Sequence, residues 1–484
     1  MKKFWKYFAI VILSLVGLCA IGILYLFIVP NSSLFGICYI SYNENFSSNI
    51  YNTTENAINK VTLNSYNYDV NIVSTEDSNI YAKVYANSFG FVLKKNSQLK
   101  IDSSLVSGNL TITVTEPNGA CVPNNSKITL YLPQLTSIDV SINNHNALTN
   151  VDDAKLVLDN FAYKTNNGEA KIKSCTISGK LTVRLNRGNY TLGDKVSLVD
   201  NDVEFNSYAG NFYGTSATLG NFTVLKNDRA MIKIKKCAKF NLSKSSAGGS
   251  VTIDEVNEIA VTSSDTNLSL GKILTGASIT LTKSGKVNVG EVNAQATIKT
   301  RDGNIVVNKA TAALYLSSTH NGNITLKDTT ASLLAESVYG DISVYFNSAA
   351  ASFAENSNAR KLQATTFDGQ IIAAGVENVS VDITGNGNAS IYMNNVIGEN
   401  YVKAGNGSAY IEFANNSAFN LKTKATTGKL NINFSTLESL GYQNHDFTGE
   451  NAFNVNTSSE NGNVLTAEVK SGFIKIRDVA TKNF

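Results

Sequence analysis

Carboxylate pairs are the first residues in this sequence that could carry acid–base chemistry. Glycosidases hold two carboxyl groups about 5 to 9.5 Å apart across the bond that they cleave. Asp302 and Asp368 both stand directly before a repeat glycine, but two further repeats lie between them, which places these acids about 14 Å apart. Two tighter clusters are Asp152-Asp153 and Asp200-Asn201-Asp202. Adjacent residues point to opposite faces of a strand, and a pair of acids in a loop is usually solvated. We therefore expect no acid–base partnership between these groups.

Histidines are the second residue type that could carry chemistry. His145, His320 and His445 all stand in turn segments that contain asparagine or aspartate, where an exposed side chain without a chemical role is expected. None has the close neighbours that a zinc site or a catalytic triad would need. The sequence also holds no Gly-x-x-x-x-Gly-Lys-Ser/Thr phosphate loop. It therefore predicts no catalytic residue, no metal site and no cofactor.

The cysteines are far apart and form no Cys-x-x-Cys pair, so neither a zinc site nor a redox pair is indicated. We expect isolated structural thiols. A disulfide between Cys38 and Cys121 stays open, because an oxidising compartment would allow it and spacing alone does not fix connectivity. The five residues are Cys19, Cys38, Cys121, Cys175 and Cys237.

Composition and charge narrow the class of protein. Of 484 residues, 43% are hydrophobic and only 16% are charged, which favours a folded, strand-rich chain over a disordered one. The formal net charge is +3, and Lys2, Lys3 and Lys6 supply three of the positive charges. The rest of the chain has no net charge with which to hold nucleic acid by counterion release, so no nucleic acid partner is expected.

An apolar run of 23 residues follows these lysines, from residue 7 to residue 29. As a helix it would be about 34 Å long, enough to cross a membrane. The positive-inside rule then places residues 1–6 in the cytoplasm and the bulk of the chain outside the cell. We predict a single-pass anchor in the cell membrane. A cleaved signal peptide is the alternative, although the run is long for one and no Ala-x-Ala site closes it.

Two segments separate the anchor from the repeats. Residues 30–60 are rich in Asn, Ser and Thr without a sustained period and are predicted to be a stalk or linker. Residues 61–150 hold alternating apolar and polar runs, such as Asp69-Val70-Asn71-Ile72, between turn residues. A period of two is typical of half-buried strands, so this segment is predicted to be an N-terminal β cap region.

Residues 151–484 repeat a unit in which a glycine precedes two alternating apolar positions, Gly-x-Φ-x-Φ. From Gly285 to Gly340 the glycines are 18, 19 and 18 residues apart, and a second alternating strand precedes each one. One such unit cannot enclose a core, but stacked units bury a continuous apolar interior. The glycines that we assign to structural corners are Gly285, Gly303, Gly322, Gly340, Gly369, Gly387, Gly407 and Gly428.

The predicted fold is therefore all-β, a parallel β-helix or β-solenoid of about 18 to 20 residues per coil, preceded by one transmembrane helix. We expect the corner glycines, often with Asn or Asp beside them, to supply a positive φ, and stacked Asn or Thr side chains to pair from coil to coil. The charged repeat at residues 472–478 is expected to protect the last exposed edge.

Tyrosines on the predicted strands form a candidate binding face. Four of them fall at alternate positions that point outward. Rows of exposed tyrosine on a rigid sheet can stack on sugars or contact another protein. The four residues are Tyr315, Tyr345, Tyr392 and Tyr410.

The combination of an N-terminal anchor, Asp69-Val70-Asn71-Ile72, the run Ile128-Thr129-Leu130-Tyr131-Leu132-Pro133 and serial Gly-x-Φ-x-Φ units resembles the bacterial putative-adhesin family of unknown function. The resemblance covers about residues 60–480. It implies a parallel β-helix-like ectodomain on the cell envelope, and the family offers no catalytic residues to carry over. The chain departs from the pattern at residues 142–146, where Asn143-Asn144 stands in place of a glycine turn.

These observations lead to a non-enzymatic cell-surface protein, adhesin-like or a scaffold, that presents a rigid β-solenoid outside the membrane. Surface glycans or envelope proteins are its expected partners. A carbohydrate-active β-helix enzyme and a membrane-tethered accessory of envelope stress or signalling are the alternatives.

Overall fold

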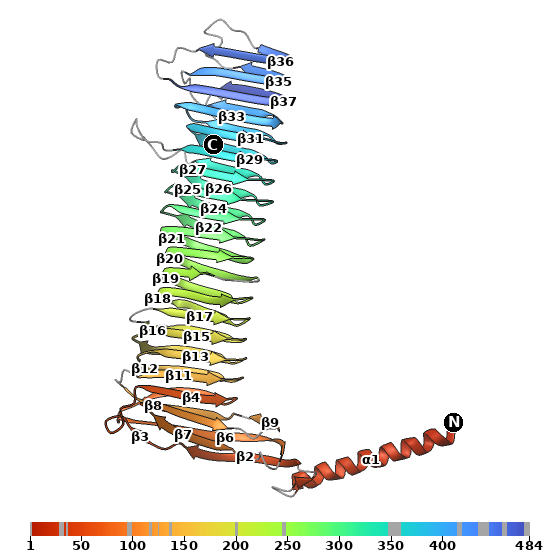
Figure 1. Ribbon diagram of the computed structural model, residues 1–484, viewed down its shortest axis with the longest axis vertical. Helices are drawn as coiled ribbons and strands as arrows, with labels where there is room; N and C mark the ends of the chain where they lie inside the picture. The colour runs from red at the N-terminus through yellow and green to blue at the C-terminus, as the bar shows by residue number, and fades with distance from the viewer. Residues whose placement is uncertain are drawn as a thin grey trace. The chain divides into compact units, whose positions relative to one another are not determined.

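The computed structural model describes residues 2–28, 33–34, 37–93, 99–115, 119–123, 125–134, 138–198, 202–243, 248–346, 360–413, 419–433, 445–456 and 462–478. The described residues form one helix, α1 (Lys2–Ile28), and otherwise β-strands (Figure 1). Two compact units make up the chain, Met1–Ala217 and Thr218–Phe484.

Helix α1 is the predicted apolar segment. Within it, the 22 residues Trp5–Leu26 have a mean hydropathy of 2.7, and the helix is long and apolar enough to cross a membrane. The helix begins at Lys2 and not at residue 7, because the basic residues before the apolar run continue the same backbone conformation. Nearly all its side chains are exposed within the chain, as a surface in contact with lipid would require.

The first unit starts with an antiparallel layer. Strand β6 (Asn79–Leu93) lies between β2 (Ile37–Ser47) and β9 (Gly119–Pro123), and pairs antiparallel with both. Strands β7 (Lys100–Val106) and β8 (Asn109–Thr115) form an antiparallel hairpin. In this layer Cys38 pairs with Val92 and Cys121 pairs with Gly90, on opposite sides of β6. Two strand spacings of about 4.8 Å exceed the reach of a disulfide, and Cys38 is a free thiol.

Parallel pairing begins at β4 (Lys60–Tyr66) and β5 (Asp69–Thr75). Strand β4 lies between β8 and β11 (Asp139–Asn144), and β5 lies between β10 (Lys127–Pro133) and β12 (Leu148–Leu158). The two segments that carried the family resemblance are therefore direct neighbours, with Val70 opposite Ile128. Where the sequence lacks a glycine turn, Asn144 closes the corner: its amide group donates to the carbonyl of Ala147 at 2.9 Å and accepts from the Ala147 N–H at 2.9 Å.

Two parallel ladders continue this unit. Strands β13 (Phe161–Thr165), β15 (Leu181–Leu185) and β17 (Val203–Ser207) follow β11, while β14 (Glu169–Ile177), β16 (Asn189–Leu198) and β18 (Asn211–Asn227) follow β12. Between the ladders Tyr163, Tyr190 and Phe212 form a buried aromatic column with ring centroids 5.7 Å apart. Aromatic burial of this kind supplies much of the core's stability.

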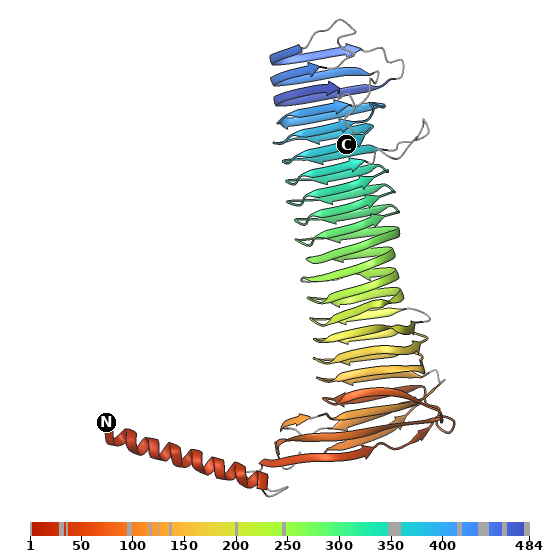
Figure 2. The same ribbon diagram turned by 180° about the vertical axis from the view of Figure 1, so that it is seen from behind.

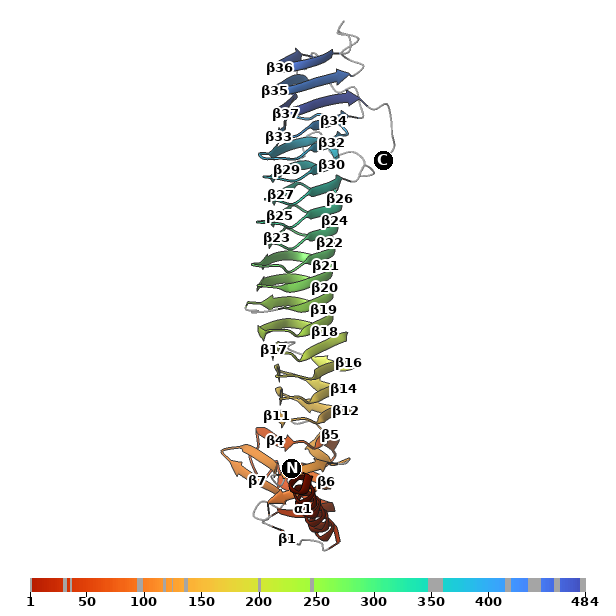
Figure 3. The same ribbon diagram turned by 90° about the vertical axis from the view of Figure 1, so that its right-hand side faces the viewer.

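The second unit repeats the arrangement in two sheets, which Figure 3 shows side by side. The strands β19 (Met231–Leu242), β20 (Gly249–Ser263) and β21 (Thr266–Leu281) are each long enough to belong to both sheets. The first half of β21 pairs with β22 in what we call sheet 1, and its second half pairs with β23 in sheet 2. Later coils use separate strands. Sheet 1 continues with β22 (Val287–Val292), β24 (Ile305–Ala310), β26 (Ile324–Thr329), β28 (Ile342–Phe346), β30 (Ile371–Val376), β32 (Ala389–Met393) and β34 (Ala409–Phe413). Sheet 2 continues with β23 (Ala296–Thr300), β25 (Leu314–Ser318), β27 (Leu333–Ser337), β29 (Lys361–Thr366), β31 (Asn378–Ile383) and β33 (Glu399–Asn406).

The register confirms the predicted parallel β-solenoid. Val287 pairs with Ile305 and Ile305 pairs with Ile324, steps of 18 and 19 residues along the chain. Within each strand the apolar residues alternate between buried and outward positions, as in Ile305, Val306 and Val307. Both inner faces therefore share one continuous apolar interior in this unit.

The C-terminal strands depart from sequence order (Figures 1 and 2). Strand β37 (Val464–Asp478) pairs in parallel with β33 and β34 on one side and with β35 (Asn420–Asn433) on the other. Strand β36 (His445–Asn456) pairs antiparallel with β35. The expectation that residues 472–478 protect the last edge is wrong, because this segment is an interior strand and Arg477 Nε donates to Glu412 Oε1 on β34 at 2.6 Å.

Candidate functional site

The outer face of sheet 1 in the second unit carries two rows of outward residues. The first row runs in register from strand to strand, and the second row lies two residues further along each strand. The first row contains Thr252, Ser269, Asn288, Val306, Thr325, Ser343, Ile372, Ser390 and Tyr410. The second row contains Asp254, Gly271, Gly290, Asn308, Lys327, Tyr345, Ala374, Tyr392 and Glu412.

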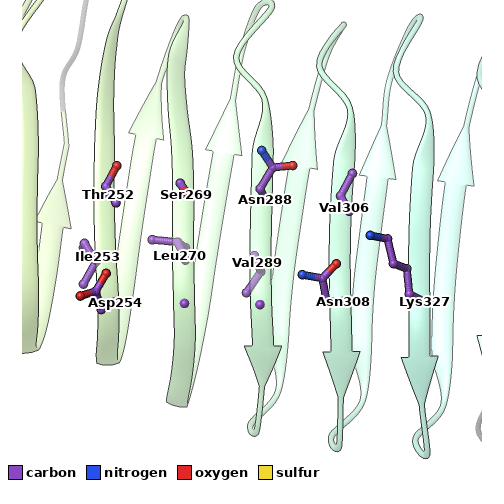
Figure 4. Close-up of a pocket in the computed structure, with 12 residues that line it drawn as sticks. Thr252, Ile253, Asp254, Ser269, Leu270, Asn288, Val289, Val306, Asn308 and Lys327 are labelled. Carbon is purple, nitrogen blue, oxygen red and sulfur yellow. The ribbon is translucent and has the colours of Figure 1, made fainter.

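A trough of about 380 Å³ crosses this face from β20 to β26 (Figure 4). Its volume falls in the range of small-molecule binding sites. Asp254 stands at one end and Lys327 at the other, four strands away, which at about 4.8 Å per strand is about 19 Å. The lining residues are Thr252, Ile253, Asp254, Ser269, Leu270, Gly271, Asn288, Val289, Gly290, Val306, Asn308 and Lys327.

Two glycines keep the floor of the trough open. A Cβ at Gly290 would lie 2.5 Å from the carbonyl oxygen of Gly271, and a Cβ at Gly271 would overlap the carbonyl of Asp254. No side chain fits these positions while the coils keep their present spacing, because the obstacle is backbone of the preceding coil. The hollow therefore results from the close stacking of successive coils at Gly271 and Gly290.

Six of the lining side chains are polar, point outward and are unpaired. Within the described residues, no hydrogen bond or ion pair engages the side chains of Thr252, Ser269, Asn288, Asn308, Asp254 or Lys327. The trough thus offers hydroxyl and amide groups with free hydrogen-bonding capacity, together with one carboxylate and one ammonium group.

A ladder of alternating charges runs beside the trough and is internally satisfied. Lys236 lies 2.6 Å from Glu255, and Glu291 lies 3.6 Å from Lys272 and 3.7 Å from Lys309. Each residue stands on the strand next to its partner. The charges at the trough itself therefore stand apart from a row whose members are already paired with one another.

Three of the four predicted tyrosines lie on this same outer face. Tyr345 on β28 is 43% exposed, Tyr392 on β32 is half-buried, and Tyr410 on β34 packs edge-on against Phe473 with ring centroids 5.0 Å apart. Tyr345 and Tyr392 share one row, with Ala374 between them. A row of aromatic surface therefore continues the second row beyond Lys327.

Tyr315 lies on sheet 2 and is engaged by its neighbours. Lys299 Nζ stands 4.9 Å from the centre of its ring, and its hydroxyl donates to Glu336 Oε2 at 2.5 Å. This hydrogen bond to Glu336, together with burial, raises the pKa of Tyr315. The structure separates this residue from the other three tyrosines.

The corner glycines stand where coils approach most closely. Of the eight, only Gly369 and Gly387 have a left-handed φ, at 149° and 152°, so the expected reason, a positive φ, is wrong for the other six. At all eight, a Cβ would lie closer than 3.0 Å to a carbonyl oxygen of the neighbouring coil. Gly428 stands within strand β35, beside Gly472, and not in a turn.

Asparagine and aspartate side chains link the corners from coil to coil. Asn304 Oδ1 accepts from the N–H of Asn323 at 3.0 Å, and Asn323 Oδ1 accepts from the N–H of Asp341 at 2.9 Å. Asp341 Oδ1 in turn accepts from the N–H of Gln370 at 2.8 Å. These links use backbone N–H groups as donors. The expected pairing of Asn and Thr side chains between coils is confirmed where the Thr311 hydroxyl donates to Asn293 Oδ1 at 3.1 Å.

The acids and histidines that the sequence singled out form no convergent acid pair. Asp302 contacts Nδ1 of His320 on the next coil, while Asp368 accepts from the N–H of Asn386 at 2.5 Å. His320 begins an exposed corner row with Tyr339 and Phe367, each of these two 49% exposed. The sequence analysis missed this row, although residues at successive corners must lie side by side in a solenoid.

The remaining chemical candidates have structural partners. Asp152 accepts from Ser174 at 2.9 Å, and Asp153 accepts from the N–H of Ser74 at 2.6 Å. His145 Nε2 lies 3.1 Å from the Asn166 amide. Asp200 and the His445 side chain lie outside the described residues. In the described part of the chain, no group of three His, Cys, Asp or Glu residues could hold a metal ion.

Burial makes two of the cysteines poor nucleophiles. Burial raises the pKa of the Cys175 thiol to about 12, with the charge of Asp153 contributing, and burial raises the pKa of Cys237 to about 12. A thiol that stays protonated at neutral pH is a poor nucleophile. Both residues therefore behave as apolar core side chains.

Comparison with known proteins identifies a family and related structures. A family model described as Toastrack DUF4097 matches residues 58–346. No curated protein matches the chain. Among solved structures, a putative cell adhesion protein from Clostridium sporogenes is 13% identical, covering 45% of this chain and 100% of its own, with a TM-score of 0.27. A putative adhesin from Bacteroides fragilis is 13% identical, covering 75% and 99%, with a TM-score of 0.15. A putative lipid binding protein from Parabacteroides distasonis is 13% identical, covering 70% and 95%, with a TM-score of 0.16.

Proposed function

Because this chain belongs to the Toastrack DUF4097 family, we propose that it is a non-enzymatic, membrane-anchored surface protein that binds its partner through the outer face of sheet 1. That face comprises the trough from β20 to β26, the tyrosine row Tyr345 and Tyr392, and Tyr410 in the neighbouring row. The partner is a surface glycan or an envelope protein.

The single observation that carries this proposal is the combination of unpaired polar side chains and exposed aromatic rings on one rigid face. Unpaired hydroxyl, amide and charged groups line the trough, and the exposed ring of Tyr345 and the half-buried ring of Tyr392 follow in the second row. Parallel ladders on both sides of every strand fix the positions of these groups before binding, which lowers the entropic cost of association. Asp254 is the one acidic residue among those that line the trough, whereas glycoside hydrolysis uses two carboxyl groups, which favours binding over hydrolysis.

The location is part of the proposal. Helix α1 serves as a single-pass anchor with Lys2, Lys3 and Lys6 in the cytoplasm. Residues 37–47, predicted to belong to a stalk, form β2 and pair with β6, so we assign them to the cap region together with residues 61–150. Residues 151–484 act as the repeat domain outside the cell. The outer face of sheet 1 is then available to partners in the envelope.

Binding is tested with the full-length chain in detergent micelles, used to capture partners from a solubilised envelope fraction. The double variant Tyr345→Ala, Tyr392→Ala should retain less than about one fifth of the captured partner, because buried aromatic residues dominate binding energy. Tyr208→Ala, at an exposed tyrosine of the first unit, is the matched control and should bind as the parent does. Equal capture by the double variant and the control contradicts the proposed face.

Topology is tested separately with epitope tags on intact cells. A tag before Lys2 should be protected from added protease, whereas a tag after Phe484 should be removed. Accessibility of the N-terminal tag, or a mature protein that begins after residue 29, would contradict the anchored arrangement.

A further inference from the structure

Positive charges outnumber negative charges around the trough. Lys233 and Lys235 stand on β19, next to Thr252 and Asp254 on β20, and Lys327 closes the opposite end. Within the described residues none of these three lysines has a carboxylate within 4.0 Å. Asp254 is the one acidic residue in the lining. The site therefore presents three free ammonium groups against one carboxylate.

The surface between these charges suits a hydroxyl-rich ligand. Ser269 and Asn288 on one row and Asn308 on the other provide donors and acceptors at successive strands, and each can both give and accept hydrogen bonds. Asp254 is a strong acceptor for hydroxyl donors. The walls carry no large apolar side chain other than Val306 on the outer rows, so an apolar ligand finds little to bury.

The trough is open and elongated. It crosses β20, β21, β22, β24 and β26, a path of about 19 Å at about 4.8 Å per strand. The tyrosine row continues in the same direction, with Tyr345 on the next strand of sheet 1. Aromatic rings stack on the apolar faces of sugar rings, so the polar trough and the aromatic row together match an extended chain.

Resting on the proposed binding function, we infer that the trough binds an anionic polyhydroxylated polymer, one whose carboxylate or phosphate groups pair with Lys233, Lys235 and Lys327. Its hydroxyl groups bond to Ser269, Asn288, Asn308 and Asp254. Lysine provides point charges here, so affinity falls as salt rises.

The test uses the full-length chain in detergent micelles with three immobilised probes: polygalacturonate, its methyl ester and poly(glycerol phosphate). Polygalacturonate should bind at least about tenfold more tightly than its methyl ester, and high salt should remove most of this difference. Binding of poly(glycerol phosphate) in addition identifies charge as the shared determinant, whereas binding of polygalacturonate alone identifies the sugar carboxylate. Equal binding of the ester and the acid overturns the inference.

Variants locate the binding on the trough. Ser269→Tyr fills the hollow without changing charge and should weaken polygalacturonate binding at least about tenfold, whereas Ser278→Tyr, on sheet 2 of the same strand β21, should leave it unchanged. The pair Lys235→Gln, Lys327→Gln should weaken binding about fivefold, and Lys361→Gln on sheet 2 is the control. Unchanged binding by Ser269→Tyr in a folded protein overturns the inference.

The same variants separate the two levels of the proposal. If no anionic polymer binds but capture of an envelope partner falls in Tyr345→Ala, Tyr392→Ala, the ligand class is wrong and the binding function stands. If neither depends on this face, both are wrong. A protein that binds the trough in place of the polymer also overturns the assignment of the ligand.

Discussion

The carbonyl oxygen of Gly303 occupies the position in which a side chain on Gly322 would begin. An ideal Cβ on Gly322 would lie closer than 3.0 Å to that oxygen. The two residues stand at equivalent corners of adjacent coils, and the backbone of one coil rests on the α-carbon of the next. Glycine is required here by the approach of two backbones, not by a left-handed φ.

Gly322→Ala should therefore destabilise the second unit, because even one methyl group forces two coils apart. The expected loss is about 1 to 3 kcal/mol, the usual cost of overpacking. In a solenoid each coil contacts only its neighbours, so hydrogen exchange should quicken near β24, β26 and β28 and stay unchanged at distant coils.

Gly276→Ala is the matched control for this change. A Cβ at Gly276 would meet nothing closer than the carbonyl of Gln295 at 4.0 Å, and its φ is not in the left-handed region. This variant should keep the parent's exchange pattern. Loss of stability by Gly276→Ala but not by Gly322→Ala would show that coil contact does not explain the glycines.

The corner glycines show how far the sequence could lead. Their spacing is a periodic property, and periodicity predicts the number of residues per coil and the parallel stacking. At six of the eight corners a positive φ was the wrong reason for glycine. The error arose because a turn with positive φ and a close backbone approach select the same residue. Only the position of the neighbouring coil distinguishes the two.

Glu291 is the shared partner in the charge ladder beside the trough, between Lys272 and Lys309. Glu291→Lys would place three lysines on consecutive strands and should destabilise the unit by about 1 kcal/mol at low salt. High salt should reduce the loss, since exposed charges are screened. Thermal unfolding at two salt concentrations measures this.

A neutral variant isolates the charge effect. Glu291→Gln removes attraction without adding repulsion and should cost less than Glu291→Lys. A loss that is the same at low and high salt would indicate damaged packing in place of electrostatics.

Tyr401 should make the C-terminal coils sensitive to alkaline pH. Burial, together with the charge of Glu468 and a 3.2 Å hydrogen bond to it, raises the pKa of Tyr401 to about 12. The folded state thus favours the neutral phenol, whose ordinary pKa is about 10. The stabilising contribution is complete below pH of about 10 and is lost as pH rises through about 12.

Absorbance of tyrosinate follows this titration. Tyr401→Phe should remove one late-titrating phenol, and Glu468→Gln should lower the pKa of Tyr401, because the carboxylate that opposes ionisation is gone. The parent and Tyr401→Phe should differ mainly between pH of about 10 and about 12. Titration of Tyr401 near the ordinary tyrosine value would contradict its contact with Glu468.

The candidate site was only partly predictable for a physical reason. Alternation along one strand predicted that Tyr345, Tyr392 and Tyr410 point outward, but it did not distinguish sheet 1 from sheet 2, where Tyr315 lies. The trough depends on Gly271 and Gly290 meeting backbone at a bend. The contact between Asp302 and His320 likewise depends on coil alignment, which local sequence patterns do not encode.

The position of β37 was beyond the reach of pattern analysis. Its Gly-x-Φ-x-Φ repeat is the same as that of any other coil, so the sequence gives no sign that it inserts between β34 and β35. A repeat motif specifies that a strand stacks, and the competition among exposed edges decides where.

Truncation after Asn463 should leave β33 and β34 with an unpaired edge and remove the strand that joins them to β35. Exposed parallel edges recruit other strands, so the chain that ends at Asn463 should form oligomers in detergent, measured by light scattering, while the parent stays monodisperse.

A synthetic peptide of residues 464–478 should restore the monodisperse form, because Ile474 and Ile476 are fully buried and supply apolar contacts to the core. The same peptide with Ile474→Asp and Ile476→Asp should fail. A truncated chain that stays monodisperse without peptide, with unchanged hydrogen exchange in β34, would mean that β35 closes the stack directly and that β37 is dispensable.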